Sequence, residues 1–154
     1  MESPRFDPDV RNDPLLQGLL AFAILLSVPV ALVLLWRYVP STMPGIYLGL
    51  GGGLAVAPLG YLLAGGLAGY FTDGPVVVVL PALGVATGAH ALSLARGAGV
   101  NPGEVFDGTL AGQVVLVGWS IAVAAGFLGI LSGTTLRSWT QSDGEDGEEF
   151  PGGE

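Results

Sequence analysis

The chain has one histidine, His90, which lies inside an apolar stretch. Ionisable groups in such stretches are costly and are usually functional. Ser93 follows three residues later, on the same side of a helix, so the pair offers a proton relay, a ligand contact or one position of a metal site. No acidic residue lies in an apolar stretch, however, and a single histidine cannot hold a metal ion. The alternative is a neutral His90 that bonds to a neighbouring helix or reaches the lipid headgroups.

The other polar side chains do not form a catalytic group. Gln113 lies one turn inside the last apolar stretch, where it can bond across helices. The segment Gly118-Trp119-Ser120-Ile121 is similar to part of the Gly-x-Ser-Gly turn of rhomboid proteases, but its last glycine is missing and the histidine precedes the serine. We therefore expect no enzyme activity, no cofactor and no bound metal.

The composition indicates a membrane protein. Of 154 residues, 51% are apolar and 12% are charged, and the mean hydropathy is +0.65. A soluble domain carries about 25% charged residues because its surface faces water. Six of the 13 acidic residues lie between Asp143 and Glu154, and four lie between Glu2 and Asp13. The ends of the chain are thus solvated, and the middle is almost free of carboxylates.

Four apolar stretches are each long enough to cross a bilayer core of about 30 Å as a helix. They cover residues 15–36, 46–71, 76–95 and 109–132. The sequence therefore predicts an all-α membrane protein, a four-helix transmembrane bundle with short loops over residues 15–134. The acidic leader 1–14 and the acidic tail 135–154 are expected to be disordered.

Details of the loops add to this prediction. The first apolar stretch is too long, and its leader too acidic, for a cleaved signal peptide. The turn Thr72-Asp73-Gly74-Pro75 predicts antiparallel neighbours on either side of it. Asp107 is placed to cap the helix that follows.

The distribution of arginine bears on orientation. Four spans place both termini on one side of the membrane. That side has Arg5, Arg11 and Arg137, and the other has Arg37 and Arg96. Because cytoplasmic loops are enriched in basic residues, we expect a multi-pass protein of the cell membrane with cytoplasmic termini.

Small residues recur four positions apart, so that each series shares one helix face. The series are Gly45, Gly49 and Gly53; Gly65 and Gly69; Gly84 and Gly88; Gly118, Ala122 and Gly126; and Gly129 and Gly133. Such faces let helix backbones approach closely in lipid. Two interpretations remain open: packing within one bundle, or an outward groove that joins copies or lines a pore.

Each of the first three stretches also has a proline near its middle, at Pro29, Pro58 and Pro81. Proline inside a helix frees a carbonyl and bends the helix. Such a bend can serve as a gating hinge, and it is also common in membrane helices that have no such role.

Charge usage points to a salt-adapted source. Every basic residue is arginine, there is no lysine or cysteine, and the net charge is −8. Strong screening in molar salt makes repulsion between carboxylates cheap. In spans, composition and tail the chain resembles the small glycine-rich polytopic membrane proteins of unknown function in haloarchaea. This resemblance includes no chemical motif and implies no activity.

The expected function is therefore that of a non-enzymatic integral membrane protein. Packing through small-residue grooves would make it an accessory or scaffold subunit, or a self-associating bundle. Its expected partners are the lipid bilayer and a membrane protein or second copy, whereas five scattered arginines form no surface for nucleic acid. The alternative is a small oligomeric channel or transporter with His90 and Gln113 near its path.

Overall fold

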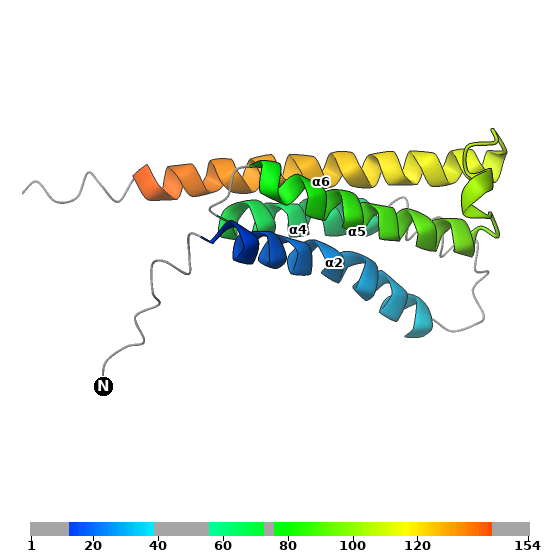
Figure 1. The fold of residues 1–154 in the computed structure, drawn as a ribbon, viewed down its shortest axis with the longest axis horizontal. Coiled ribbons are helices and arrows are strands. Elements are labelled where there is room, and N and C mark those ends of the chain that lie inside the picture. Colours follow the sequence, from blue (N-terminus) through cyan, green and yellow to red (C-terminus); the bar gives the residue numbers. More distant parts are fainter. Residues whose placement is uncertain (1–12, 39–55, 73–75, 143–154) are drawn as a thin grey trace, which may run out of the picture.

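The structure is a computed structural model that describes residues 13–38, 56–72 and 76–142 (Figure 1). All regular structure in these ranges is helical, which confirms the prediction of an all-α fold. The helices are α2 (Pro14–Tyr38), α4 (Ala57–Phe71), α5 (Val76–Gly97), the short 3-10 helix η2 (Pro102–Glu104) and α6 (Leu110–Ser142).

Three of these helices, α2, α5 and α6, are long and apolar enough to cross a membrane, over Pro14–Leu34, Val78–Gly97 and Leu110–Gln141. The helix α4 has 15 residues and covers the second half of the second predicted span. The first half of that span lies outside the described residues, as do residues 1–12 and 143–154 of the predicted leader and tail. Three of the four predicted spans are therefore supported.

The helices form a bundle that runs up and down (Figure 1). Helices α2 and α5 run in one direction, and α6 returns along them in the other. Helix α4 is parallel to α6, because Leu62 and Gly66 contact Gly129, and Gly66 and Tyr70 contact Gly133. The described chain therefore begins and ends at the same end of the bundle.

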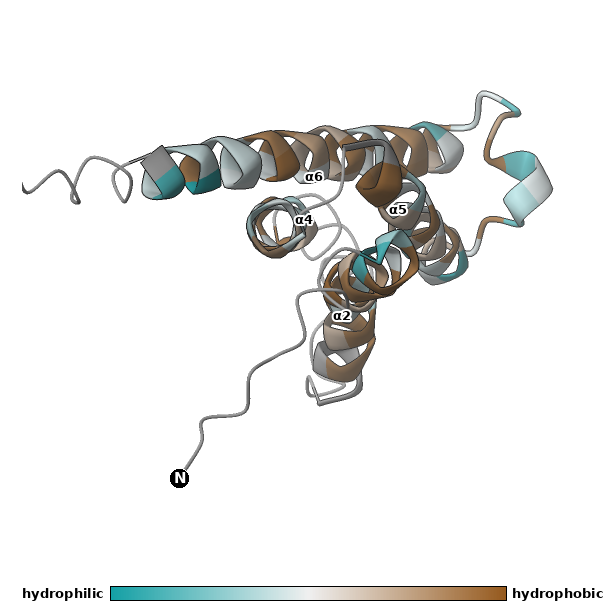
Figure 2. Ribbon diagram, turned by 60° about the vertical axis from the view of Figure 1, so that its left-hand side comes forward, coloured by the Kyte–Doolittle hydropathy of each residue, from teal (hydrophilic) through white to brown (hydrophobic). Residues whose placement is uncertain are grey.

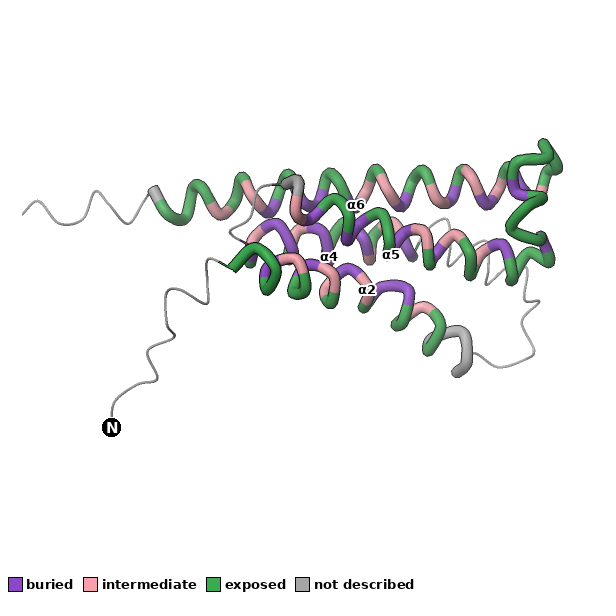
Figure 3. Tube along the Cα trace, viewed as in Figure 1, coloured by how far each residue is buried: buried purple, intermediate pink, exposed green. Residues whose placement is uncertain are grey.

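Most of the surface of the bundle is apolar. Figure 3 shows buried positions where helices meet and exposed positions along the outer sides of α2 and α6, and Figure 2 shows that these helices are largely hydrophobic. Of the most apolar stretches of α2, α5 and α6, 28%, 39% and 33% are buried. The remaining apolar faces are suited to contact with lipid chains.

Helix α6 extends ten residues beyond Ser132, where the last span was predicted to end, so residues 135–142 of the predicted disordered tail are helical. The hydroxyls in this stretch donate to carbonyl oxygens of their own helix: Thr135 to Leu131, Ser138 to Thr135, and Thr140 to Arg137. Polar side chains that bond back to the backbone in this way are compatible with a helix.

Two helices begin with side-chain caps. The carboxylate of Asp13 accepts a hydrogen bond of 2.9 Å from the N–H of Leu15 at the start of α2. At the start of α6, the N–H of Gly112 donates to the hydroxyl oxygen of Thr109 at 3.2 Å. Thr109, not the expected Asp107, thus takes the cap position.

Candidate functional site

His90 lies in the interior of the bundle, with 4% of its surface exposed. Its ring meets the ring of Tyr61 edge to face, with centroids 5.7 Å apart and planes at 65°. Tyr61 is fully buried on α4, and its hydroxyl donates to the carbonyl oxygen of Ala86 on α5 at 2.8 Å. Since Ala86 lies one turn before His90, these contacts join α4 to α5 at a single polar position.

The Nε2 atom of His90 is buried and has no hydrogen-bond partner among the described residues. The hydroxyl of Thr87, one turn earlier on α5, donates to the carbonyl oxygen of Leu83 at 2.8 Å. A buried polar atom without a partner costs about 1–3 kcal/mol, and such atoms are rare in folded proteins. A histidine at this buried position therefore lowers the stability of the fold.

The other two predicted polar residues do not join His90. Ser93 is exposed on α5, whereas His90 is buried. Gln113 is exposed at the start of α6, where its side-chain amide donates to the carbonyl oxygen of Gly108 at 3.3 Å. The structure thus brings Tyr61, which the sequence did not single out, to His90. A tyrosine in an apolar, glycine-rich stretch was the available signal.

Within the described ranges, no group of three or more histidine, aspartate or glutamate side chains is arranged to hold a metal ion. Glu104 and Asp107 lie in the loop between α5 and α6, at the end of the bundle where the chain turns back (Figure 1). His90 is instead in the interior of the bundle. The imidazole of His90 can donate or accept a hydrogen bond or carry a proton at that position.

The predicted glycine series of α4 and α6 face each other. A Cβ on Gly65 would overlap the carbonyl oxygen of Gly126, and one on Gly69 would overlap that of Ile130. From the other side, a Cβ on Gly129 or Gly133 would overlap the carbonyl oxygens of Leu62 or Gly66. These backbones therefore touch directly, a contact that permits dispersion and weak Cα–H···O bonds.

The glycine series of α5 is different. Among the described residues, a Cβ added to Gly84 or Gly88 would meet no atom beyond its own helix within 4 Å, and Gly84 is exposed. Gly49 and Gly53, which were also predicted to pack, lie outside the described residues. Helix α5 thus presents two glycines, one turn apart, on a side that no described helix covers.

Arg137 makes a contact that sequence reasoning missed. Its guanidinium donates to the carbonyl oxygen of Thr72 at 3.0 Å, at the C-terminal end of α4. A positive charge is favourable there, because the last carbonyls of a helix carry partial negative charge. The bond ties the ends of α4 and α6 together across 65 residues of sequence.

Comparisons of the sequence and the structure with models of protein families, with curated proteins and with solved structures found no significant match.

Proposed function

We propose that the chain is a non-enzymatic integral membrane protein that acts through helix packing. It serves as an accessory or scaffold subunit, or associates with further copies of itself. Three helices long and apolar enough to cross a membrane support the first part of this proposal. Their outer faces are apolar along most of their length, which suits lipid and other membrane helices.

The observation that carries the packing role is the open glycine face of α5. Where α4 meets α6, glycines one turn apart allow the two backbones to touch. Gly84 and Gly88 have the same spacing, and a Cβ added at either would meet no atom of another described helix within 4 Å. Because close backbone contact is a main source of helix association in lipid, this face can accept a helix from another chain.

Single-cysteine cross-linking tests the role directly, since the chain has no cysteine of its own. Gly84→Cys fills open space, and Ala124→Cys is the matched control at an exposed position on α6. In reconstituted vesicles treated with copper phenanthroline, self-association predicts disulfide-linked dimers of the Gly84→Cys variant well above the control.

The same variants in native membranes, kept in molar salt, test the accessory role. A bifunctional cross-linker attached at Gly84→Cys should then capture a second membrane protein that the Ala124→Cys variant does not capture. Equal, low yields from both variants, in vesicles and in native membranes alike, would contradict the packing function.

A second candidate function is an oligomeric channel or transporter, and the buried Nε2 of His90 favours it. An unpaired polar atom is retained in the interior of a bundle at a cost in stability, which is typical of residues on a transport path. Vesicles with the reconstituted protein should then conduct an ion or small solute, and His90→Phe should abolish the flux. If vesicles with the unchanged protein conduct no cation, anion or small solute, this candidate function is refuted.

We also propose cytoplasmic termini and adaptation to high salt, on the arginine distribution and the net charge of −8. Adaptation predicts that the detergent-solubilised protein resists unfolding better in molar potassium chloride than at low salt, where repulsion between its carboxylates is unscreened. Thermal unfolding followed by circular dichroism at both salt concentrations measures this difference, and equal or lower stability in molar salt would contradict it.

A further inference from the structure

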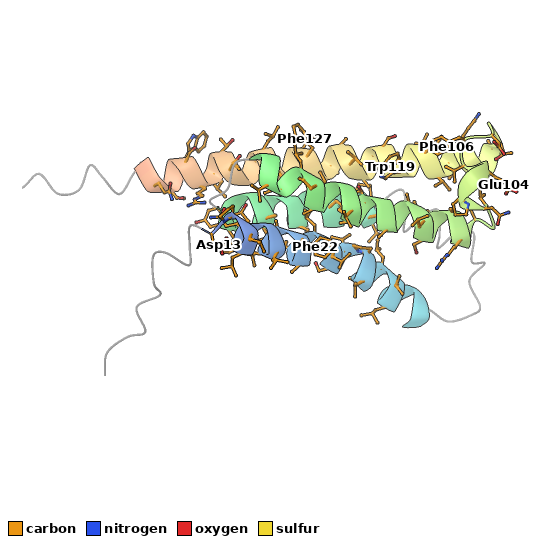
Figure 4. All side chains as sticks on the ribbon, in the orientation of Figure 1. Asp13, Phe22, Glu104, Phe106, Trp119 and Phe127 are labelled. Atoms are coloured by element: carbon orange, nitrogen blue, oxygen red, sulfur yellow. The ribbon has the colours of Figure 1, made fainter. Side chains whose placement is uncertain are left out.

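The two most exposed large apolar side chains of the described residues lie where the loop between α5 and α6 joins α6: Phe106 is in the loop, and Leu110 is the first residue of the helix. Leu110 is 80% exposed and Phe106 is 75% exposed. Both lie at the end of the bundle where α5 turns back into α6, and Figure 4 labels Phe106 there. The acidic residues Glu104 and Asp107 lie close to them in the sequence, and both are exposed.

This loop, residues 98–109, is a folded cap. Gly99 has φ of +68°, the left-handed conformation that glycine adopts readily, and it ends α5. The N–H of Gly99 donates to the carbonyl oxygen of Arg96, and that of Val100 donates to Ala95 at 2.9 Å. This pair of bonds is the Schellman arrangement, which satisfies the last carbonyls of a helix.

The rest of the cap also bonds internally. The carboxylate of Glu104 accepts hydrogen bonds from the backbone N–H and the side-chain amide of Asn101, at 3.2 and 3.1 Å. These bonds hold the pKa of Glu104 below its usual value. The N–H of Asp107 donates to the carbonyl oxygen of Glu104. Backbone donors that are satisfied internally lower the cost of leaving bulk water.

A small apolar core lies beneath the cap. Val100 and Val105 are buried against Ala95 of α5 and Val115 of α6. The cap is therefore held on the bundle by its own packing, and Phe106 and Leu110 are not needed to fill that core. Their apolar surfaces are free to meet something outside the chain.

The length of α6 indicates what Phe106 and Leu110 contact outside the chain. Trp139 lies 29 residues after Leu110 on one continuous helix, and it is 68% exposed. At about 1.5 Å per residue, the two are separated by about 43 Å. A bilayer is about 30 Å thick across its hydrocarbon core and about 40–45 Å with its headgroup regions. When one of these residues lies in one headgroup layer, the other reaches the opposite layer.

Helix α5 agrees with this placement. Its 22 residues span about 33 Å, close to the hydrocarbon thickness, and Arg96 lies in its last turn. The cap begins immediately after that turn, so it falls at the depth of the headgroups. Aromatic residues such as Trp139 are enriched at the same depth of the opposite layer.

We propose that the cap lies in the lipid headgroup layer, with Phe106 and Leu110 inserted at the edge of the acyl chains as an anchor. This inference rests on the proposed integral membrane function. The occupant of the exposed apolar pair is thus the lipid surface itself. Glu104 and Asp107 keep contact with water and hold the insertion shallow, because carboxylates do not enter the hydrocarbon.

Tryptophan fluorescence measures this depth. In a background with Trp36, Trp119 and Trp139 replaced by phenylalanine, one variant carries Phe106→Trp and a matched control carries Val117→Trp. Val117 is 53% exposed on the outer side of α6, two turns into the span. Both proteins are reconstituted in vesicles whose lipids are brominated either near the glycerol end or near the methyl end of the acyl chains, after circular dichroism has shown equal helicity.

The anchor predicts that shallow bromines quench Phe106→Trp more than deep ones, and that acrylamide in the buffer quenches it weakly. Deep bromines should quench Val117→Trp more strongly than they quench Phe106→Trp. The anchor alone would be overturned if acrylamide quenched Phe106→Trp and neither brominated lipid did, while brominated lipid still quenched the Val117→Trp control. Loss of lipid quenching in both variants would instead refute the membrane function.

Discussion

Replacing Gly129 by alanine tests the direct contact between α4 and α6. A Cβ at this position would overlap the carbonyl oxygen of Leu62 and would lie 2.9 Å from the nitrogen of Gly66. Both are backbone atoms, so the helices must separate to admit the methyl group. The separation loosens the neighbouring contacts at Gly65, Gly69 and Gly133 as well.

The magnitude follows from two opposing effects. Overpacking in a well-packed interior costs about 1–3 kcal/mol, and the better helix propensity of alanine returns up to about 1 kcal/mol. We therefore expect Gly129→Ala to lower the free energy of unfolding by about 1–2 kcal/mol. Gly84→Ala is the matched control, because its methyl group would meet no atom of the other described helices within 4 Å. It should leave the free energy unchanged or raise it by up to about 1 kcal/mol.

The assay is unfolding in mixed micelles by titration with sodium dodecyl sulfate, followed by circular dichroism. It is carried out at a protein concentration low enough for both variants to be monomeric. Equal free energies for Gly129→Ala and Gly84→Ala would refute the direct backbone contact. A loss confined to Gly84→Ala would place the close-packed interface on α5 instead.

Three further predictions concern individual contacts. Arg137→Gln should lower the free energy of unfolding by about 0.5–1.5 kcal/mol in the same titration, because the carbonyl of Thr72 loses a charged donor. An unchanged free energy of unfolding would show that this bond contributes nothing to stability. His90→Phe keeps a ring against Tyr61 and removes both nitrogens, so it should raise the free energy of unfolding by about 1 kcal/mol. A marked decrease in the free energy of unfolding would mean that Nε2 has a partner in the membrane. The pKa of Glu104 is lower in the folded cap than in the unfolded chain, because its carboxylate accepts hydrogen bonds from Asn101. These bonds therefore stabilise the cap fully above the ordinary carboxyl pKa of about 4.3, and this stabilisation is lost as the pH falls through the pKa of the folded state. Exchange of the Asn101 amide hydrogen should accelerate on acidification relative to that of Val100, and Glu104→Gln should show no such acceleration.

The sequence predicted the helical class and most helix limits because hydrophobic length is a strong local signal. The limits of α5 differ from the predicted span only by the two residues at its end, and α2 differs by one or two at each end. Pro29 and Pro81 lie inside α2 and α5, as predicted. Within the described residues, Pro58 is instead in the first turn of α4.

Which helix packs against which could not be predicted from the sequence in the same way. Glycines at identical spacing have different neighbours: Gly65 and Gly69 touch α6, whereas a Cβ added at Gly84 or Gly88 would meet no described atom outside its own helix within 4 Å. Spacing along one helix defines a face but does not say which helix meets it. The extension of α6 past Ser132 was missed for a related reason: hydroxyls that bond to their own helix and a contact from Arg137 to α4 offset its polar composition.

The central claim is that α6 crosses a membrane, and the accessibility of its two ends in sealed vesicles tests it most directly. Single cysteines replace Asp107 in the cap and Thr140 near the end of α6, both exposed and flanking the apolar helix. With uniformly oriented vesicles and a membrane-impermeant maleimide, one position should be labelled in intact vesicles and the other only after lysis. Labelling of both positions in intact vesicles would contradict a transmembrane α6.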